Sequence, residues 1–299
     1  MIKRILVPLD GSDLAESALP YAERIAAKTG AEVLLLTSLY HVDSWAGHLV
    51  QADQESVPLV RTYLEVKGKE LQAKGIAVKT DITSGPAAEA IVSHVVDENE
   101  DLIVMSSHGR SGITRWVFGS VAHKVLHGAR CPILLVRPTS GSAKAIDIPV
   151  IGKILVPLDG SEHSLAVLPF IEGFAKAFDA SLVLLNVVLP LTAYVGAEFV
   201  IPTRDFLDEQ LAWARQFLSR VVKEAEGRGV KAAQMVMVGT GASEIVQAAD
   251  DAGADMIALS THGRSGLSRS LMGSVADAVV HRATLPFLVV RPPEAKRQA

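Results

Sequence analysis

Residues Arg4–Ser12 read RILVPLDGS, and residues Lys153–Ser161 read KILVPLDGS. In both copies an aliphatic run reaches a proline and is followed by an Asp-Gly-Ser turn. Such a run predicts a strand buried on both faces, and the turn residues predict that a helix opens directly after it. The copies are 149 positions apart. That period is far beyond the roughly 20 to 50 residues of a solenoid repeat, so the chain is expected to be a duplicated domain.

A second pair of matching stretches lies near the end of each half. Ser107–Gly112 reads SHGRSG and precedes GSVA at Gly119, and Thr261–Gly266 reads THGRSG and precedes GSVA at Gly273. Each half is therefore expected to fold around a core of its own. The expected boundaries are a first domain at 1–138, a linker rich in Ser, Ala and Gly at 139–152, a second domain at 153–292 and a polar tail at 293–299.

The composition of the chain argues against several classes of protein. Its 299 residues carry a formal net charge of −4, which is unlike a basic nucleic-acid-binding protein. Hydrophobic residues make up 49% of the chain, too many for a disordered protein. Cys131 is the single cysteine, so no intramolecular disulfide is expected, and the opening Met1–Arg4 lacks the apolar stretch of a signal peptide. We therefore expect a cytoplasmic location.

One apolar segment has the length of a membrane-spanning helix. The 18 residues between Asp179 and Glu198 carry no formal charge. Asn186 and Pro190 interrupt this segment. We interpret it as a buried strand over Leu182–Val188 that continues into an apolar loop, and we expect no membrane association.

Each half alternates short β-rich runs with longer amphipathic ones. This pattern is typical of the α/β class, in which a parallel sheet carries helices on both faces. The expected strands of the first half are Arg4–Leu9, Glu32–Leu39, Ala77–Ile82, Asp101–Ser106 and Cys131–Arg137. Those of the second half are Lys153–Leu158, Ser181–Val188, Lys231–Val238, Asp255–Leu259 and Leu285–Val290.

The helices of the first half are predicted from apolar spacing. Apolar residues recur every three or four positions over Leu14–Ala26, which predicts a helix there, and Asp13 and Glu16 have the spacing of a capping box. A later helix is expected to begin near Pro86, a residue suited to the first helical position. The stretch 40–67 is polar and poorly periodic, which predicts a long connection that acts either as a lid or as a plain connector.

An acidic residue follows the first strand of each half. Asp10 and Asp159 precede Gly-Ser at a helix start. They are expected at the carboxyl end of a parallel strand, the edge at which open α/β sheets bind ligands. Two interpretations stay open for them: a carboxylate that faces a ligand, or a turn residue with local hydrogen bonds.

A glycine-rich stretch follows the fourth strand of each half, with identical internal spacing. Glycine lets backbone N–H groups approach a ligand closely, and Gly-Ser at a helix start presents unpaired N–H donors that favour a phosphate group. Arginine side chains suit phosphate oxygens, although a solvated loop arginine is the alternative for each of them. The residues are Ser106, Gly109, Arg110, Arg115, Gly119 and Ser120 in the first half, and Ser260, Gly263, Arg264, Arg269, Gly273 and Ser274 in the second.

Other candidate residues are weaker. His108 and His262 stand beside glycine in the tight loop, where histidine is more often structural, and no partner stands at metal-ligand spacing. His127 and His281 are expected late in a helix, where they interact favourably with the helix dipole. The chain has no Walker, nucleophile-elbow or Cys-x-x-Cys sequence. We therefore predict no catalytic residue and no metal ligand.

Both halves resemble the universal stress protein domain. The matching elements are the opening ILVPLDGS, the Gly-x2-Gly-x9-Gly-[Ser/Thr] nucleotide motif, and the closing CPILLVR at Arg137 and LPFLVVR at Arg291. The resemblance implies two tandem flavodoxin-like domains of the Rossmann-like, adenine nucleotide alpha hydrolase-like type. Each would be a five-stranded parallel sheet of order 3-2-1-4-5, with strands 1 and 4 at the topological switch point.

The resemblance also implies a site for ATP, and Mg²⁺ is inferred from the phosphates that it usually accompanies. In ATP-binding members the adenosine lies near the first two strands and the phosphates lie on the glycine loop. The motif has glycine where this chain has Ser106 and Ser260, so the serine restricts the turn and adds a hydroxyl close to the phosphates. The implicated residues are Pro8, Leu9, Asp10, Ser38, Ser106, His108, Gly109, Arg110, Gly119 and Ser120 in the first half, and Pro157, Leu158, Asp159, Val187, Ser260, His262, Gly263, Arg264, Gly273 and Ser274 in the second.

The last strand of each half is implicated in assembly. The resemblance implies dimerisation through this strand, and Ile133–Val136 and Phe287–Val290 are apolar strands that would be prone to aggregate if left open. In a tandem chain the two halves can pair with each other as an internal pseudo-dimer. A homodimer of the whole chain stays open as a further arrangement.

Three functions are compatible with these patterns. The first is an ATP-binding sensor or signalling module of the stress response, with little turnover because no general base faces a γ-phosphate. The second is a nucleotide-independent interaction scaffold in which the glycine loops are structural and empty. The third is an ATP-consuming enzyme of a similar fold, for which no catalytic sequence is recognisable.

Overall fold

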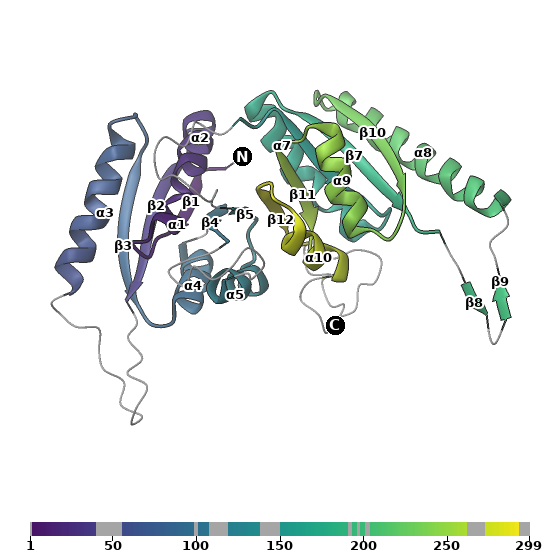
Figure 1. Cartoon of the computed structure of the whole chain (residues 1–299). Helices are drawn as coiled ribbons and strands as arrows, with labels where there is room; N and C mark the ends of the chain where they lie inside the picture. Colours follow the sequence, from purple (N-terminus) through teal and green to yellow (C-terminus); the bar gives the residue numbers. More distant parts are fainter. Residues whose placement is uncertain are drawn as a thin grey trace, which may run out of the picture. The chain divides into compact units, whose positions relative to one another are not determined.

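The structure is a computed structural model of the chain (Figure 1). It describes residues 2–39, 56–98, 101–107, 119–137, 150–190, 193–195, 198–200, 204–261 and 273–292. The chain divides into two compact units, Met1–Pro149 and Val150–Ala299, and each is described by itself. Positions 139–149 of the expected linker and the whole expected tail lie outside the described residues, so both stay predictions.

The first unit is a parallel sheet of order β3-β2-β1-β4-β5 with helices between successive strands (Figure 1). Strand β1 pairs in parallel with β2 on one side and with β4 on the other. Its elements are β1 (Arg4–Pro8), α1 (Asp13–Glu16), α2 (Leu19–Thr29), β2 (Glu32–Leu39), α3 (Ser56–Gln72), β3 (Val78–Ser84), α4 (Ala87–Glu98), β4 (Leu102–Ser106), α5 (Ser120–Gly128) and β5 (Ile133–Val136).

The second unit repeats this arrangement in the order β10-β7-β6-β11-β12. It adds an antiparallel pair of short strands, β8 and β9, between β7 and α8. Its elements are β6 (Lys153–Pro157), α6 (Glu162–Leu165), α7 (Leu168–Phe178), β7 (Ser181–Val188), β8 (Ala193–Val195), β9 (Glu198–Val200), α8 (Arg204–Gly227), β10 (Ala232–Val238), α9 (Ala242–Ala252), β11 (Met256–Ser260), α10 (Ser274–Arg282) and β12 (Phe287–Val290).

The predicted fold class and strand order are confirmed in both units. Each of the ten predicted strands is present, with ends that differ by two residues or fewer. The central strands are fully buried, as their aliphatic runs predict: Leu6 in β1, Ile103 in β4, Leu155 in β6 and Ile257 in β11 are each 0% exposed. A strand covered on both faces has no polar side to alternate with, which is why these runs are continuously apolar.

The first predicted helix is wrong in two details. It is two helices, α1 and α2, because Pro20 stands in the first turn of α2 and favours a new helix start there. The residue that caps α1 is Ser12 and not Asp13, since the Ser12 hydroxyl accepts a hydrogen bond from the Ala15 N–H. Ser161 caps α6 in the same way, by accepting from the Ser164 N–H.

Two predicted connections contain regular structure. Helix α3 begins at Ser56, inside the stretch 40–67 that was expected to be irregular. It buries Leu64 and Leu71, whereas its Leu59 and Val66 are exposed. Positions 40–55 lie outside the described residues. The apolar loop expected after β7 contains the β8–β9 pair, since Ala193–Val195 and Glu198–Val200 form an antiparallel ladder.

The 18-residue segment without charge is a strand where the structure describes its start. Residues Ser181–Val188 form β7, in register with β6 and β10 on either side. Across the described part of the chain, no helix has the length and apolar character needed to cross a membrane.

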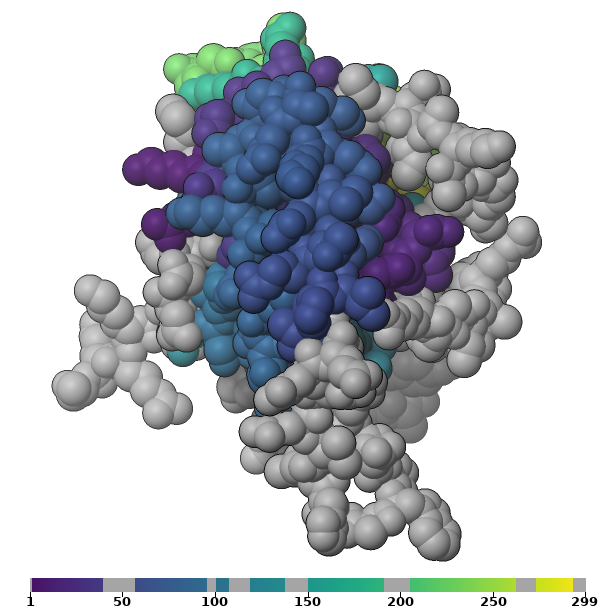
Figure 2. All heavy atoms as spheres, turned by 90° about the vertical axis from the view of Figure 1, so that its left-hand side faces the viewer, coloured from purple at the N-terminus to yellow at the C-terminus, as the bar shows by residue number. Residues whose placement is uncertain are grey.

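Helices cover the sheet of the first unit on both faces. Helix α2 packs on β1 and β2, and α3 packs on β2 and β3, whereas α4 and α5 pack against each other. Right-handed crossovers place the helices before and after the reversal of direction at β1 on opposite faces. Figure 2 looks onto the side of this unit where α3 and β3 lie.

A carboxylate ties the starts of the two central strands together in each unit. In the first unit the Asp101 Oδ2 atom accepts hydrogen bonds from the N–H groups of Lys3 (2.6 Å) and Arg4 (3.1 Å). In the second unit Asp255 Oδ2 accepts from Gly152 (2.8 Å) and Lys153 (2.9 Å). Each aspartate directly precedes the fourth strand of its unit, so these hydrogen bonds align the start of the fourth strand with the start of the first strand.

An ion pair in each unit holds the second helix against the turn before the third strand. In the second unit Glu172, 6% exposed, accepts two hydrogen bonds from Arg228, at 2.6 and 2.7 Å. At the matching place in the first unit, Lys74 Nζ lies 2.6 Å from Glu23 Oε2, but the Glu23 side chain is more exposed, at 19%. Loss of the charged partner should destabilise the fold more at Glu172 than at Glu23, because a buried carboxylate is less well solvated by water.

We predict that Arg228→Ala lowers the free energy of unfolding by about 1.5 to 3 kcal/mol, because Glu172 then stays buried without its charged donor. The matched change Lys74→Ala should cost about 1 kcal/mol or less, since water can solvate Glu23. Urea denaturation of the two variants measures both values. Equal losses in the two variants would contradict the assigned difference in burial.

Candidate functional site

Each unit has one pocket at the carboxyl ends of its first and fourth strands. The pocket of the first unit has a volume of about 300 Å³, and that of the second has about 350 Å³. Pockets of this size, with mostly apolar walls and a few polar groups, are typical of small-molecule sites. The position is the switch point of the sheet, where the chain leaves neighbouring strands in opposite directions.

The predicted residues of the first unit converge on its pocket. All seven of them that the structure describes line it. They are Pro8, Leu9, Asp10, Ser38, Ser106, Gly119 and Ser120. His108, Gly109 and Arg110, together with Arg115, lie outside the described residues, so their place stays a prediction.

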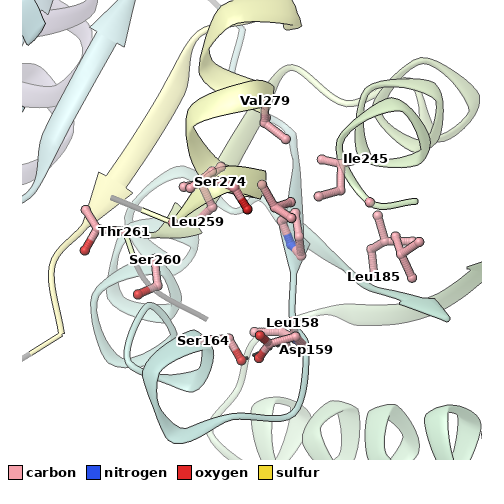
Figure 3. Close-up of a pocket in the computed structure, with 16 residues that line it drawn as sticks. Leu158, Asp159, Ser164, Leu185, Ile245, Leu259, Ser260, Thr261, Ser274 and Val279 are labelled. Carbon is pink, nitrogen blue, oxygen red and sulfur yellow. Dashed lines mark hydrogen bonds between the residues drawn. The ribbon is translucent and has the colours of Figure 1, made fainter. Parts of the chain in front are cut away.

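The second unit repeats this convergence (Figure 3). Asp159 and Ser274 face the pocket from opposite ends, and Ile245 and Leu185 face each other across its apolar side. All of the described predicted residues line the pocket: Pro157, Leu158, Asp159, Val187, Ser260, Gly273 and Ser274. The positions of His262, Gly263, Arg264 and Arg269 are outside the described part.

The strand-end aspartate makes the predicted local hydrogen bonds and also lines the pocket, and its contact with a ligand stays a prediction. Asp10 Oδ1 accepts hydrogen bonds from the Ser12 N–H (3.0 Å) and the Ser12 hydroxyl (2.6 Å), and Asp10 also lines the pocket. Asp159 Oδ1 accepts equivalent bonds from Ser161, at 2.9 and 2.6 Å. The local bonds hold the carboxylate at the pocket edge.

A buried polar side chain on the second strand holds the pocket loop in each unit. Thr37 Oγ1 donates to the Leu9 carbonyl (2.9 Å), and Asn186 Nδ2 donates to the Leu158 carbonyl (2.7 Å). Thr37 is 7% exposed and Asn186 is 3% exposed. A buried carbonyl needs such a donor, so these residues position the backbone that carries the aspartate. The sequence reasoning missed both, although a polar residue inside an apolar strand is the signal for them.

The turn between the third strand and the next helix is held differently in the two units. Ser38 Oγ donates to the Gly85 carbonyl (2.6 Å), so its proton is used within the protein. The second unit has Val187 at the equivalent place, and there Glu244 accepts from the Gly241 N–H (2.8 Å) instead. A Cβ atom on Gly239 would overlap the Glu244 carboxyl group, which explains the glycine there.

The serine that replaces the first motif glycine does not restrict a turn. Ser106 is the last residue of β4 and pairs with Val136, and Ser260 is the last residue of β11 and pairs with Val290. Among the described residues, Asp179 is the one non-glycine with a positive φ, so both serines have backbone angles open to any residue. The expectation of a restricted turn is therefore wrong, and what remains is a hydroxyl at the pocket wall.

The helix that follows the glycine loop begins at the pocket. Gly119 precedes α5 in an extended conformation and Gly273 precedes α10 likewise, and neither helix has a side-chain cap. The first N–H groups of an α-helix have no partner within the helix. Because Ser120 and Ser274 line the pockets, these helix starts present donors and the positive end of the helix dipole to a ligand.

The apolar walls of the pockets were missed. None of these residues was predicted at the site, because apolar positions on helices and strands usually lie in the core. In the first unit they include Leu36, Ile91, Met105 and Val121. In the second they include Leu185, Ile245, Leu259, Val275 and Val279.

Comparison with known sequences identifies the family. A sequence model described as Universal stress protein family matches residues 1–137 and 151–291. The chain belongs to the universal stress protein family. The two matched regions correspond to the two compact units, so this is a tandem member with one family domain in each.

Curated members of the family match one unit or the whole chain. A universal stress protein of Methanocaldococcus jannaschii is 37% identical over 146 residues, which cover 48% of this chain and 83% of the relative. A universal stress protein of Mycobacterium tuberculosis is 25% identical over 301 residues, which cover 96% of both chains. The second relative therefore matches along the tandem arrangement.

Solved structures share the fold across the whole chain. A universal stress protein from Archaeoglobus fulgidus superposes with a TM-score of 0.70 at 18% identity, covering 97% of each chain. A putative universal stress protein from Pseudomonas aeruginosa gives a TM-score of 0.71 at 20% identity, covering 97% of this chain and 94% of the other. At these identities the likeness shows the fold.

The Glu244 cap generates a pH-dependent prediction. Burial would raise the pKa of Glu244, but hydrogen bonds from backbone N–H groups, Gly241 among them, outweigh it and lower the pKa. A lowered pKa in the folded state adds stability above the unfolded-state pKa, and this stability is lost as the pH falls. We expect Glu244→Gln to reduce the free energy of unfolding by up to about 1 kcal/mol at neutral pH.

The difference between the wild type and Glu244→Gln should be constant above about pH 5 and should shrink toward pH 3. Denaturation in urea over this range measures it. The matched control is Ala90→Gln, at the equivalent place on α4, which should leave the pH dependence unchanged. A difference that stays constant down to pH 3 would show that the carboxylate charge has no part in the cap.

Proposed function

We propose that each unit of this protein binds an adenine nucleotide, ATP, and that the chain acts as a nucleotide-dependent sensor or signalling module of the stress response. The observation that carries the proposal is the convergence of the strand-end aspartate, the fourth-strand serine and the Gly-Ser helix start on one pocket in each unit. Family membership supports it, since ATP-binding members have their motif at these positions.

The phosphates are assigned to the end of the pocket where α5 or α10 begins. Uncapped N–H donors at a helix start are a general site for phosphate groups. Gly109 and Arg110, and Gly263 and Arg264, complete this end in the proposal, because the motif places them between the fourth strand and the helix.

The base is assigned to the apolar part of the pocket. Ile91 and Leu36 in the first unit, and Ile245 and Leu185 in the second, supply surfaces of the kind that pack against a flat ring. The units differ at Ser38 and Val187, so the hydroxyl that the first unit has on its second strand is replaced by an apolar side chain in the second unit.

Mg²⁺ is proposed to accompany the phosphates. This ion prefers oxygen ligands and is usually held by one or two carboxylates together with substrate phosphates. Ser120 and Ser274 lie at the phosphate end of the described linings and would hold it there, whereas Asp159 faces the pocket from the opposite end. When bound, the ion neutralises phosphate charge.

Binding rather than turnover is proposed for both pockets. Among the described residues of each lining, Asp10 or Asp159 is the one ionisable side chain, and its Oδ1 atom already accepts two bonds from its own turn. Such a lining holds no residue arranged as a general base toward a γ-phosphate, which favours slow hydrolysis at most.

We predict that Mg-ATP titrated into nucleotide-free protein by calorimetry binds with a stoichiometry of two per chain. One site per chain would mean that a single unit binds. No heat, together with failure of ATP to compete with a fluorescent analogue and an elution volume unchanged by nucleotide, would overturn the proposal in favour of a nucleotide-independent scaffold.

Substitution of the first helical serine by glutamate tests whether phosphate binds at the starts of α5 and α10. We expect Ser120→Glu to remove binding in the first unit and Ser274→Glu to remove it in the second, since a carboxylate there repels phosphate. Both serines are exposed and an acidic residue is favourable in the first turn of a helix, so folding should be preserved. Ser120→Gln and Ser274→Gln are size-matched neutral controls that should retain two sites. If the Glu variants bind as the wild type does, the phosphates lie elsewhere.

A further inference from the structure

Two histidines on α5 face each other across one helical turn. The Nε2 atoms of His123 and His127 lie 3.1 Å apart, and the ring centroids are 4.3 Å apart. Residues four apart lie on the same side of a helix, so this contact is made within α5. Neither histidine lines the nucleotide pocket of the first unit.

We propose that His123 and His127 form a binding site for a divalent transition-metal ion such as Zn²⁺. Two imidazole nitrogens that bind one Zn²⁺ each lie about 2.0 to 2.1 Å from it. With the 3.1 Å between these Nε2 atoms, such an ion would have an N–metal–N angle of about 98°. This angle lies between those of octahedral and tetrahedral coordination, so the separation of the two nitrogens is compatible with one shared metal ion.

Imidazole ligands select the class of ion. Nitrogen ligands of this kind suit Zn²⁺, Cu²⁺ and Ni²⁺, whereas Mg²⁺ and Ca²⁺ require oxygen ligands. His123 is exposed and His127 is half-buried, so water can reach the ion and complete its coordination. The described part of the chain has no cluster of three or more metal-binding side chains, which makes the proposed site a two-ligand, hydrated one.

In the absence of metal, the same geometry is a hydrogen bond between the rings. One Nε2 atom carries the proton and donates it to the other Nε2 atom. Metal binding requires a lone pair on both Nε2 atoms, so this proton moves to the Nδ1 atom of its own ring. That ring changes tautomer, and no proton is released to solvent. The change in tautomer gives a direct spectroscopic signature of the site.

The second unit offers a matched comparison. Asp277 and His281 occupy the equivalent positions on α10, but the His281 Nδ1 atom lies 2.8 Å from the Asp277 backbone carbonyl oxygen. It lies farther, 3.6 Å, from the Asp277 Oδ1 atom. Because that nitrogen faces the helix backbone, the pair does not present two ligands to one ion.

The test is a titration of nucleotide-free, chelator-treated protein with ZnCl₂, followed by calorimetry and by the ¹⁵N resonances of the histidine rings. We expect the Nε2 resonances of His123 and His127 to shift together, and millimolar MgCl₂ to leave them unchanged. His123→Ala and His127→Ala should each weaken Zn²⁺ binding by about tenfold or more, since even outer-shell partners contribute that much. His281→Ala should bind as the wild type does.

A substitution on α10 tests whether the same pair of histidines creates a second Zn²⁺ site. Asp277→His creates the same spacing on α10 and should add a second equivalent of Zn²⁺. Alanine favours helix more than histidine does, so the Ala variants should keep α5 folded, and circular dichroism checks this. His123→Gln is the alternative variant if His123→Ala loses structure. The proposal is overturned if both Ala variants retain the affinity of the wild type, or if His281→Ala weakens binding equally.

Discussion

The pairing of β1 with β4, and of β6 with β11, is the contact on which the rest of each unit depends. These strands are far apart in the sequence, yet Ile5 lies opposite Leu102 and Leu155 lies opposite Ile257. The chain leaves the first strand toward β2 or β7 and returns on its other side, so the loops after the two central strands diverge. The pocket is the space that this divergence leaves, and the strand-end residues Asp10 and Ser106, like Asp159 and Ser260, line it because their strands are paired.

Comparison of the two units shows which hydrogen bonds at the pocket edge are shared and which side chains differ. Both units keep an aspartate that is bonded to a serine two residues on, and both use a buried side chain to hold the backbone carbonyl next to it. The chemistry of that side chain changes from a hydroxyl in Thr37 to an amide in Asn186. A donor is therefore required at this place, whereas its identity is free, because a buried carbonyl needs one hydrogen bond of either kind.

The turn between the third strand and the next helix is held by a different side chain in each unit. Ser38 on β2 reaches the turn before α4 from a neighbouring strand, and Glu244 reaches the turn before α9 from within its own helix. Each unit has lost the residue that the other uses, since Val187 and Ala90 stand in their places. The pockets therefore differ in their lining while their backbone stays alike.

Much of the fold was predictable because its elements depend on local pattern. Continuous aliphatic runs identify buried parallel strands, and the repeated Asp-Gly-Ser identifies the turn after them. The failures have local physical causes as well. Pro20 divides the first helix, and Ser106 belongs to a strand and not to a turn. The family resemblance named seven described residues in each half, and all of them line one pocket, because parallel strands end at the same edge of a sheet.

The sequence by itself determined the duplication, the α/β class, the strand order through its family and the polar residues of the pocket edge. Only the tertiary structure decided which buried apolar residues also line a pocket, as Ile91 and Ile245 do, and which polar residues are hydrogen-bonded across strands. It also placed the two histidine nitrogens of α5 face to face. The reason is that periodicity reports whether a side chain is buried, while its partners depend on the register and rotation of elements that are distant in the chain.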